Sequence, residues 1–388
     1  MRDITAVVAV YNNLNRTIKF VEDFNRRFPD IPLSISCVGS SQEVQDELKR
    51  QYGEEVITGT TERISFSENW NYAINGVTTS KFVLVHNDMY LDDDFFDQLE
   101  GYYLDSPKNF YVYTTVEPIR NAGFFRPGKV VANFGDDTDT FQKEKFLDFA
   151  KKYKESHRLK GRGYGFYLAG FTESIQDVGG FDSKTFFPMF CEDDDLLVRI
   201  RKKGYILYTA PSAIVYHFGS KTARNLGDIK MSNSEIERNR DFARKWGFEA
   251  RYLWETGYEF EDEPLETGTE KIGYRVGAET TVPFRDIINV EPLVDVLDID
   301  TSNSEFLKYF VDYKKEEKLG GIEDCDIILT QVGPGNFNLF AYLVGGLRFK
   351  YKSLEPGTRR YGNYLVEVRR VYKDRNRQDL RNYLSLQK

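Results

Sequence analysis

The first fifty residues alternate short apolar runs with amphipathic segments, and this alternation constrains the fold more than any other feature. Residues 4–10 form an apolar run with the length of a strand that is buried on both faces, as in a parallel sheet. Residues 16–28 repeat apolar side chains at helical spacing, and residues 33–37 alternate as a second strand. A second helix is expected over residues 43–52. Strand, helix, strand and helix in this order predict a right-handed βαβ unit and an α/β fold.

Length and composition predict two domains rather than one. With 388 residues the chain is longer than a typical domain, and its 40% hydrophobic and 15% aromatic content can bury a sizeable core. Residues 255–270 are acidic and contain proline and glycine, which makes them the predicted linker. We therefore expect one domain over residues 1–254 and a smaller α/β accessory domain over residues 271–388.

Charge, cysteine content and hydropathy limit the compartment and the partners. The net charge of −8 argues against a surface that binds nucleic acid or anionic membrane throughout, although the segment from Arg348 to Lys388 is basic. The three cysteines, Cys37, Cys191 and Cys325, show no CxxC spacing, which favours a reducing compartment. No apolar stretch approaches the roughly 20 residues of a membrane span. These features predict a cytoplasmic protein without a transmembrane segment.

A first candidate site follows the strand predicted over residues 82–85. That strand runs into His86, Asn87 and Asp88, and ligands bind at the carboxyl ends of strands in open α/β sheets. A lone aspartate there can hold a divalent cation whose other ligands are substrate phosphates, and the alternative is a solvated turn. The acidic triplet Asp92–Asp94 precedes a predicted helix, so capping and pairing with the helix dipole explain it better than a metal does.

A second candidate site is the acidic cluster 192–195, which stands at a predicted helix start and is followed by a strand ending at His217. Acids are common at a helix N-terminus, and Asp195 can pair with Arg199 one turn later. Four acids in succession nevertheless repel one another, and an acid kept under such repulsion can have a raised pKa and act as a base. Imidazole with carboxylate suits Mn²⁺, whereas carboxylates alone prefer Mg²⁺.

Three segments, in this order, resemble the nucleotide-sugar-dependent glycosyltransferases of the inverting family 2, which have the GT-A fold. The first is similar to the family's helix and Asp-x-Asp metal motif, the second to its Gly-Gly-Phe-Asp and Glu-Asp-x-Asp region, and the third to a late strand that ends in histidine. They read FSENWNYAINGV with KFVLVHNDMYL, VGGFDSKTFFPMFCEDDDLLVRIRKKGY, and APSAIVYHFGS. The resemblance covers residues 5–247 and implies a Rossmann-like mixed sheet flanked by helices.

The resemblance also implies roles for individual residues. Asp88 matches the last acid of the metal motif and His217 matches the late histidine, so both are implied ligands of Mn²⁺ or Mg²⁺. Asp193 matches the catalytic base of the family, and Glu192 supports it. His86 stands where the family has the first acid of the metal motif. The expected donor-binding residues are Tyr11, Asn71, Asn87, Asp88 and Arg162, the last in a glycine-rich turn that could close over the diphosphate or the acceptor.

The implied activity moves a hexosyl or pentosyl group from a nucleoside diphosphate, with UDP favoured, to an acceptor hydroxyl with inversion at the anomeric carbon. A saccharide is the expected acceptor. Two alternatives stay open: a modified nucleobase in DNA as the acceptor, contacted by the basic segment, or an inactive protein that binds sugar nucleotides or glycans. The C-terminal domain resembles a degenerate Rossmann-like methyltransferase without its glycine-rich cofactor loop. We expect it to be a scaffold, a dimer surface or an acceptor-binding domain.

Overall fold

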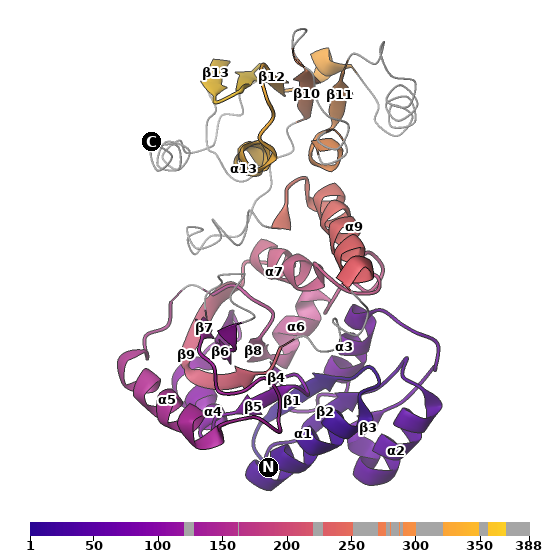
Figure 1. Cartoon of the computed structure of the whole chain (residues 1–388), viewed down its shortest axis with the longest axis vertical. Coiled ribbons are helices and arrows are strands. Elements are labelled where there is room, and N and C mark those ends of the chain that lie inside the picture. Colours follow the sequence, from indigo (N-terminus) through magenta and orange to yellow (C-terminus); the bar gives the residue numbers. More distant parts are fainter. Residues whose placement is uncertain are drawn as a thin grey trace. The chain divides into compact units, whose positions relative to one another are not determined.

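The chain forms two compact units, each with its own sheet (Figure 1). The first unit contains residues 1–238, and the second begins at residue 239. The predicted α/β class with a second, smaller sheet is therefore confirmed. The predicted linker, 255–270, lies outside the described residues, so the predicted domain bounds stay a prediction. The computed structural model describes residues 1–119, 128–161, 163–219, 228–250, 271–276, 280, 287, 290–299, 321–348 and 356–369.

Nine strands of the described chain form the mixed sheet of the first unit, in the order β3-β2-β1-β4-β8-β6-β9-β5 with β7 beside β6. The first four strands in this order are parallel, β8 runs antiparallel to both of its neighbours, and β5 runs antiparallel to β9. The strands are β1 (Ile4–Ala9), β2 (Leu33–Ser36), β3 (Val56–Ile57), β4 (Lys81–Leu84), β5 (Met89–Leu91), β6 (Asn109–Glu117), β7 (Lys129–Val131), β8 (Leu168–Phe171) and β9 (Ile206–His217).

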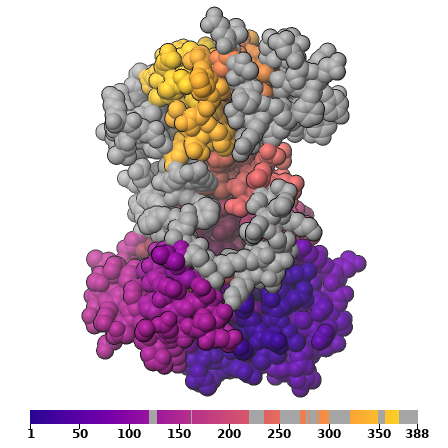
Figure 2. Space-filling model, in the orientation of Figure 1, coloured from indigo at the N-terminus to yellow at the C-terminus, as the bar shows by residue number. Residues whose placement is uncertain are grey.

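Helices cover both faces of this sheet (Figure 1). The buried side chains of α1, α2 and α4 belong to the core on one face, and α3, α6 and α7 lie on the other. On the surface of this unit, the N-terminal part, in indigo, lies beside the part in purple and magenta that includes α5 (Figure 2). The helices are α1 (Leu14–Arg27), α2 (Gln42–Tyr52), α3 (Phe66–Asn75), α4 (Phe95–Gln98), α5 (Lys143–Ser156), α6 (Thr172–Val178) and α7 (Glu192–Lys202). The helix α9 (Asp228–Trp246) contains the boundary between the two units.

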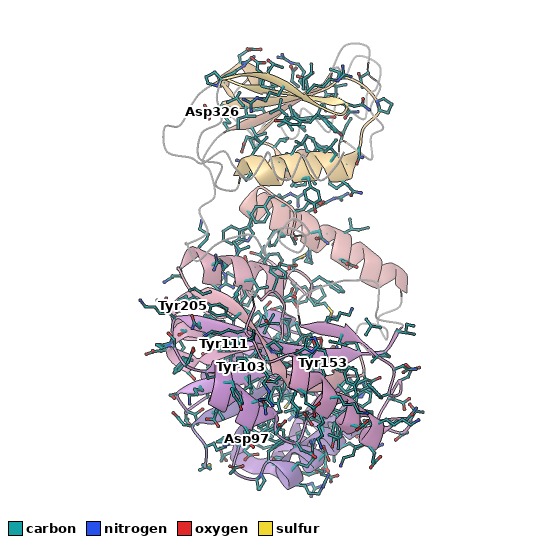
Figure 3. The ribbon with its side chains drawn as sticks, turned by 90° about the vertical axis from the view of Figure 1, so that its left-hand side faces the viewer. Asp97, Tyr103, Tyr111, Tyr153, Tyr205 and Asp326 are labelled. Atoms are coloured by element: carbon teal, nitrogen blue, oxygen red, sulfur yellow. The ribbon has the colours of Figure 1, made fainter. Side chains whose placement is uncertain are left out.

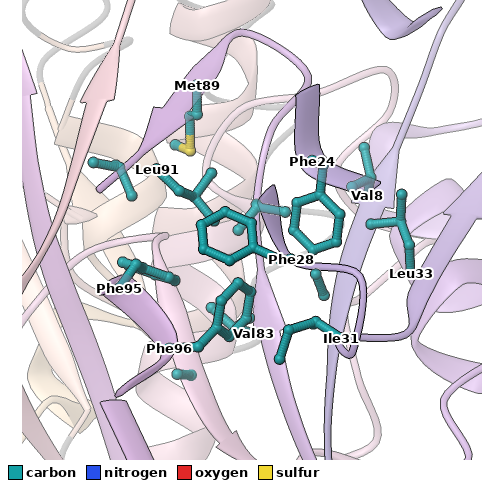
Figure 4. Close-up of a cluster of buried hydrophobic side chains, with 14 of the residues drawn as sticks. Val8, Phe24, Phe28, Ile31, Leu33, Val83, Met89, Leu91, Phe95 and Phe96 are labelled. Carbon is teal, nitrogen blue, oxygen red and sulfur yellow. The ribbon is translucent and has the colours of Figure 1, made fainter. Parts of the chain in front are cut away.

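Aromatic side chains that pack α1 and α4 against the strands form the centre of the core on one face (Figure 4). The ring centroid of Phe24 lies 5.4 Å from that of Phe28 and 5.9 Å from that of Phe96, and Phe28 and Phe96 are 5.0 Å apart. Val8 of β1 and Val83 of β4 pack into the same cluster. Burying each such side chain contributes about 1.5–3 kcal/mol. The cluster therefore fixes the strands whose ends carry the first candidate site.

Buried tyrosines support the long strand β9. The rings of Tyr103 and Tyr111 lie 5.9 Å apart (Figure 3). The Tyr103 hydroxyl lies 2.7 Å from the Ser212 hydroxyl, and Tyr111 donates a hydrogen bond to Asp105. Buried phenol groups are stable when their hydroxyls find such partners. Because Ser212 belongs to β9, this contact anchors the strand that ends at His217.

The second unit has a five-stranded sheet among its described residues, in the order β11-β10-β12-β14-β13. The first three strands in this order are parallel, and β14 and β13 continue the sheet as an antiparallel pair. Phe340 of the helix α13 packs within the core of this unit and lies 5.2 Å from Tyr274 between ring centroids. The elements are β10 (Ile272–Val276), β11 (Val296–Asp298), β12 (Ile327–Gln331), α13 (Phe337–Arg348), β13 (Gly357–Tyr361) and β14 (Tyr364–Val368).

Candidate active site

Strand pairing brings Asp88 and His217 together although 128 residues separate them in the sequence. Asp88 stands between β4 and β5, and Met89 of β5 pairs with His217 of β9 in the antiparallel register. The Phe218 amide donates a hydrogen bond of 3.0 Å to the Asp88 carbonyl, which extends this pairing. As a result, His217 Nε2 lies 3.4 Å from Asp88 Oδ1. The two implied metal ligands therefore share one site.

His86 lies beside this pair and could supply a third ligand. Its Nδ1 is 3.8 Å from Asp88 Oδ1, and one ligand atom from each of His86, Asp88 and His217 lies within 4.8 Å of the others. The His86 ring packs against Trp70 at 5.5 Å and Phe166 at 5.0 Å between ring centroids. The sequence placed His86 in the position of a missing acid. The His-x-Asp spacing after a buried strand was the available signal for a ligand.

The chemistry of these three side chains fits a divalent transition metal. Asp88 is buried, and its Oδ1 accepts no well-aligned hydrogen bond from any residue that the structure describes. A buried carboxylate is costly unless a cation lies beside it; the charged form of His217 is such a cation in the metal-free protein, and a metal ion would take its place. Two imidazoles with one carboxylate suit Mn²⁺ better than Mg²⁺, which prefers oxygen ligands. Asp88, His217 and His86 are therefore the residues that would hold the ion.

Opposite charges stabilise the ionised forms of Asp88 and His217. Burial alone would lower the pKa of His217, but the negative charges of Asp88 and Glu117 outweigh burial and raise it to about 9. Burial alone would raise the pKa of Asp88, but His217 outweighs it and holds that pKa below its usual range. Without a metal, His217 is an imidazolium between two carboxylates. Metal binding at Nε2 therefore requires the loss of a proton.

A cavity of about 200 Å³ opens beside this group. Five of the predicted site residues line this cavity, and these are Tyr11, Asn87, Asp88, Glu192 and His217. Tyr11 follows β1 and Asn87 follows β4, so the neighbouring parallel strands deliver both residues to one edge of the sheet. The Asn87 amide donates to the Thr17 hydroxyl at 2.9 Å, which ties this edge to α1. A pocket of this kind at strand ends is a typical ligand site.

The acidic cluster at the start of α7 divides into two pairs. Asp194 accepts a hydrogen bond from the Tyr164 hydroxyl, and Asp195 pairs with Arg199 at 2.8 Å, so both hold the fold together. Glu192 lines the cavity, whereas Asp193 is partly exposed and does not belong to the cavity lining. Of the four acids, only Glu192 lines the cavity, and the catalytic roles of Glu192 and Asp193 stay predictions.

Glu192 has an unusual environment for a carboxylate. Its Oε2 is buried and has no hydrogen-bond partner among the described residues. Burial, together with the neighbouring charge of Asp193, raises the pKa of Glu192 well above its ordinary value. The two residues before it, Phe190 and Cys191, have backbone φ angles of 87° and 62°, which residues other than glycine rarely adopt. This strained turn aims Glu192 into the cavity, and such strain is concentrated at functional sites.

One predicted donor-binding residue, Asn71, does not line the cavity. The Asn71 side-chain amide donates a hydrogen bond to the Phe181 carbonyl and accepts one from the Phe181 N–H, each of 2.8 Å. Asn69, two residues earlier on α3, does line it and donates to the Val10 carbonyl at 2.7 Å. Arg162 lies outside the described residues.

The triplet Asp92–Asp94 is satisfied without a metal. The Lys154 ammonium group donates to both Asp92 and Asp94, and Asp93 pairs with Arg27 at 2.6 Å. Ion pairing thus explains the triplet, where the sequence suggested capping.

Comparison with known proteins identifies the family. The family model described as "Glycosyltransferase like family 2" matches residues 2–241, which is more than half of the chain. The chain belongs to this family, as its motifs predicted. No curated protein matches the chain. No helix of the described chain is both long and apolar enough to cross a membrane.

Many solved structures are similar to this chain, among them the following three. The mannosyltransferase PcManGT from Pyrobaculum calidifontis, in complex with GDP-Man and Mn²⁺, is 15% identical with a TM-score of 0.40, and the match covers 62% of this chain and 64% of that one. GalNAc-T7 with UDP, GalNAc and Mn²⁺ is 13% identical with a TM-score of 0.40, and the match covers 63% of this chain and 50% of that one. Residues 1–349 of S. aureus TarS are 10% identical with a TM-score of 0.36, and the match covers 62% of this chain and 69% of that one. The chain thus spans less than two thirds of the first two proteins.

Proposed function

We propose that this chain is an inverting, metal-dependent glycosyltransferase that uses a nucleoside diphosphate sugar as donor. The observation that carries the proposal is the convergence of Asp88, His217 and Glu192 on one cavity within a domain of glycosyltransferase family 2. Neither the carboxylate–imidazole pair nor the cavity alone would indicate this reaction. Together they supply a cation site and a substrate pocket at the strand ends of the sheet.

The metal-binding group is expected to hold the diphosphate of the donor. Asp88 and His217, with His86 beside them, would bind Mn²⁺, which when present neutralises the negative charge that grows on the departing phosphate. Asn87 and Tyr11 line the same cavity and orient the nucleotide there. UDP is the favoured nucleotide, and the sugar is a hexose or a pentose.

The chemical step is a single displacement at the anomeric carbon. The acceptor oxygen forms a bond to this carbon as the bond to the diphosphate oxygen breaks, and the configuration inverts. The acceptor proton passes to the Asp193 carboxylate, which acts as the general base. Glu192 supports this base: burial and the charge of Asp193 raise its pKa, so it keeps its proton to a higher pH than an ordinary glutamate and in that form can donate a hydrogen bond to an oxygen of the substrate.

The acceptor is proposed to be the hydroxyl of a saccharide. A modified nucleobase in DNA is the other acceptor considered, and it depends on the basic segment from Arg348 to Lys388. Most of that segment lies outside the described residues. The saccharide acceptor follows from the family resemblance, and a nucleobase in DNA stays the alternative.

A donor-hydrolysis assay tests the proposal. Purified protein is supplied with UDP-sugars and GDP-sugars in Mn²⁺, and release of nucleoside diphosphate is measured. We expect turnover to fall by about 10²-fold in Asp88→Asn and by about 10²–10⁴-fold in Asp193→Asn, the latter when an acceptor is present. Asp92→Asn is the matched control, because Asp92 is a buried acid that pairs with Lys154 outside the cavity. Absence of turnover with every donor, or equal turnover in all three variants, would contradict the proposal.

A further inference from the structure

Glu117 stands directly behind the predicted metal ligand His217. Glu117 is the last residue of β6, and His217 is the last residue of β9. These strands are parallel, and the residues just before their ends, Val116 and Tyr216, are partners in the register. The two strands therefore end side by side. The sequence alone gave no sign of this neighbour, because Glu117 belongs to no motif and meets His217 only through the pairing of β6 with β9.

The two nitrogens of the His217 ring face different partners. Nδ1 lies 3.4 Å from Glu117 Oε1 and 3.1 Å from the Tyr167 hydroxyl. Nε2 lies 3.4 Å from Asp88 Oδ1 on the opposite side of the ring. Glu117, Tyr167 and His217 are all buried. The ring is consequently held at Nδ1 by protein groups, while Nε2 faces the carboxylate with which it would share a metal.

Glu117 is itself held in place from two sides. The Thr115 hydroxyl donates to Glu117 Oε1 at 3.2 Å, and the Lys129 ammonium lies 3.6 Å from Oε2. The side chains of Glu117 and Lys129 are each only 7% exposed. Glu117 does not line the cavity, so it does not contact a substrate bound there. A buried carboxylate that is fixed by a lysine and directed at an imidazole has one evident use, which is to orient that imidazole.

We propose that Glu117 is a positioning residue that holds the Nδ1–H of His217 and thereby presents the Nε2 lone pair to the metal. This inference rests on the proposed metal site. It adds to that site a supporting carboxylate, Glu117, whose Oε2 is in turn held by Lys129. Carboxylates behind metal-binding histidines fix the tautomer and the ring orientation and make the ligand more basic. Metal affinity should therefore depend on a residue that touches neither the metal nor the substrate.

Mn²⁺ affinity tests this inference directly. Titrations of the full chain with Mn²⁺ in the presence of UDP, followed by electron paramagnetic resonance, give the affinity without requiring turnover. We expect Glu117→Gln to weaken Mn²⁺ binding by about 10–100-fold, which is the usual effect of losing such a partner. Asp92→Asn is the matched control: it removes another buried carboxylate that pairs with a lysine but contacts none of the predicted ligands. Its Mn²⁺ affinity should equal that of the wild type.

A second readout separates positioning from folding. In ¹⁵N-histidine spectra of the metal-free protein, the Glu117→Gln variant should show a changed tautomer or charge state for His217, whereas the Asp92→Asn variant should not. If Glu117→Gln does not fold, Thr115→Val tests the same contact, because it removes the hydroxyl that holds Oε1. Wild-type affinity in the folded variant would overturn the inference. Failure of the wild type itself to bind Mn²⁺ would instead overturn the proposed function.

Discussion

At the scale of single residues, Glu192 shows how one position can be costly for stability and useful for chemistry. Its carboxyl group is buried at the cavity, Oε2 has no hydrogen-bond partner among the described residues, and Asp193 adds a neighbouring negative charge. Both effects disfavour the ionised form, so the pKa of Glu192 is raised. Raised pKa values of this kind are concentrated at active sites.

This arrangement predicts the pH dependence of stability. Folded Glu192 keeps its proton to a higher pH than the unfolded chain does, so its contribution to the free energy of unfolding falls as pH rises above the ordinary glutamate pKa of about 4.3. Glu192→Gln cannot titrate and escapes this loss. Urea denaturation from pH 4 to pH 8 should show the variant gaining stability relative to the wild type as pH rises. A difference that stays constant over this range would contradict the account.

Asn71 gives a second prediction at this scale. Both ends of its amide group bond to the Phe181 backbone, so Asn71→Ala leaves a backbone donor and acceptor without partners. We expect a loss of about 1–3 kcal/mol in the free energy of unfolding, measured by denaturation in urea. The affinity for a nucleotide donor should be unchanged, since Asn71 does not line the cavity. A loss of donor affinity with unchanged stability would instead support the donor-binding role that the family resemblance implies.

Sequence reasoning reached some of these residues and missed others for identifiable reasons. Asp88 and His217 stand at the ends of apolar runs within family motifs, and the structure brings them together. His86 was seen only as a replacement for an acid. Glu117 carries no local signal at all, since its contact with His217 depends on two strand ends that are distant in the sequence.

At the scale of secondary structure, β5 decides whether the site can form. It has only three residues, too few for a periodicity in the sequence, yet its pairing with β9 sets Met89 opposite His217. The strand over residues 82–85 and the strand ending at His217 could each be predicted from apolar runs. Their spatial relation could not, because β-sheet register between distant segments is fixed by tertiary packing rather than by local pattern.

The aromatic cluster behind β4 and β5 gives a prediction for this scale. Phe96 packs edge to face against Phe24 and Phe28 and is buried. Phe96→Ala should lower the free energy of unfolding by about 3–5 kcal/mol, because it removes a ring from a packed core and leaves a cavity. Tyr102, which is 56% exposed, is the control; Tyr102→Ala should stay within about 0.5 kcal/mol in the same urea titration. Equal losses in the two variants would contradict the packing described for Phe96.

At the scale of the whole molecule, the chain combines a family 2 domain with a second α/β unit. The alternation of strands and helices predicted both sheets. Ile287 and Val290 are helical, although the apolar residues at 287, 288 and 290 would also fit a strand, because a short apolar run fits a buried helix as well as a strand. The three parallel strands with an antiparallel pair in the second unit agree with an α/β accessory domain. Its role as a scaffold, a dimer surface or an acceptor-binding domain stays a prediction.

The central claim, that Asp88 and His217 form the metal site of a sugar-nucleotide enzyme, is tested most directly by locating the ion. Crystals soaked with UDP and Mn²⁺ should give an anomalous scattering peak at manganese wavelengths between Asp88, His217 and the diphosphate, with His86 beside it. The acids Asp92 and Asp94 offer an alternative site, although Lys154 already occupies them. A peak at these acids, or no peak at Asp88 when UDP is bound in the cavity, would contradict the claim.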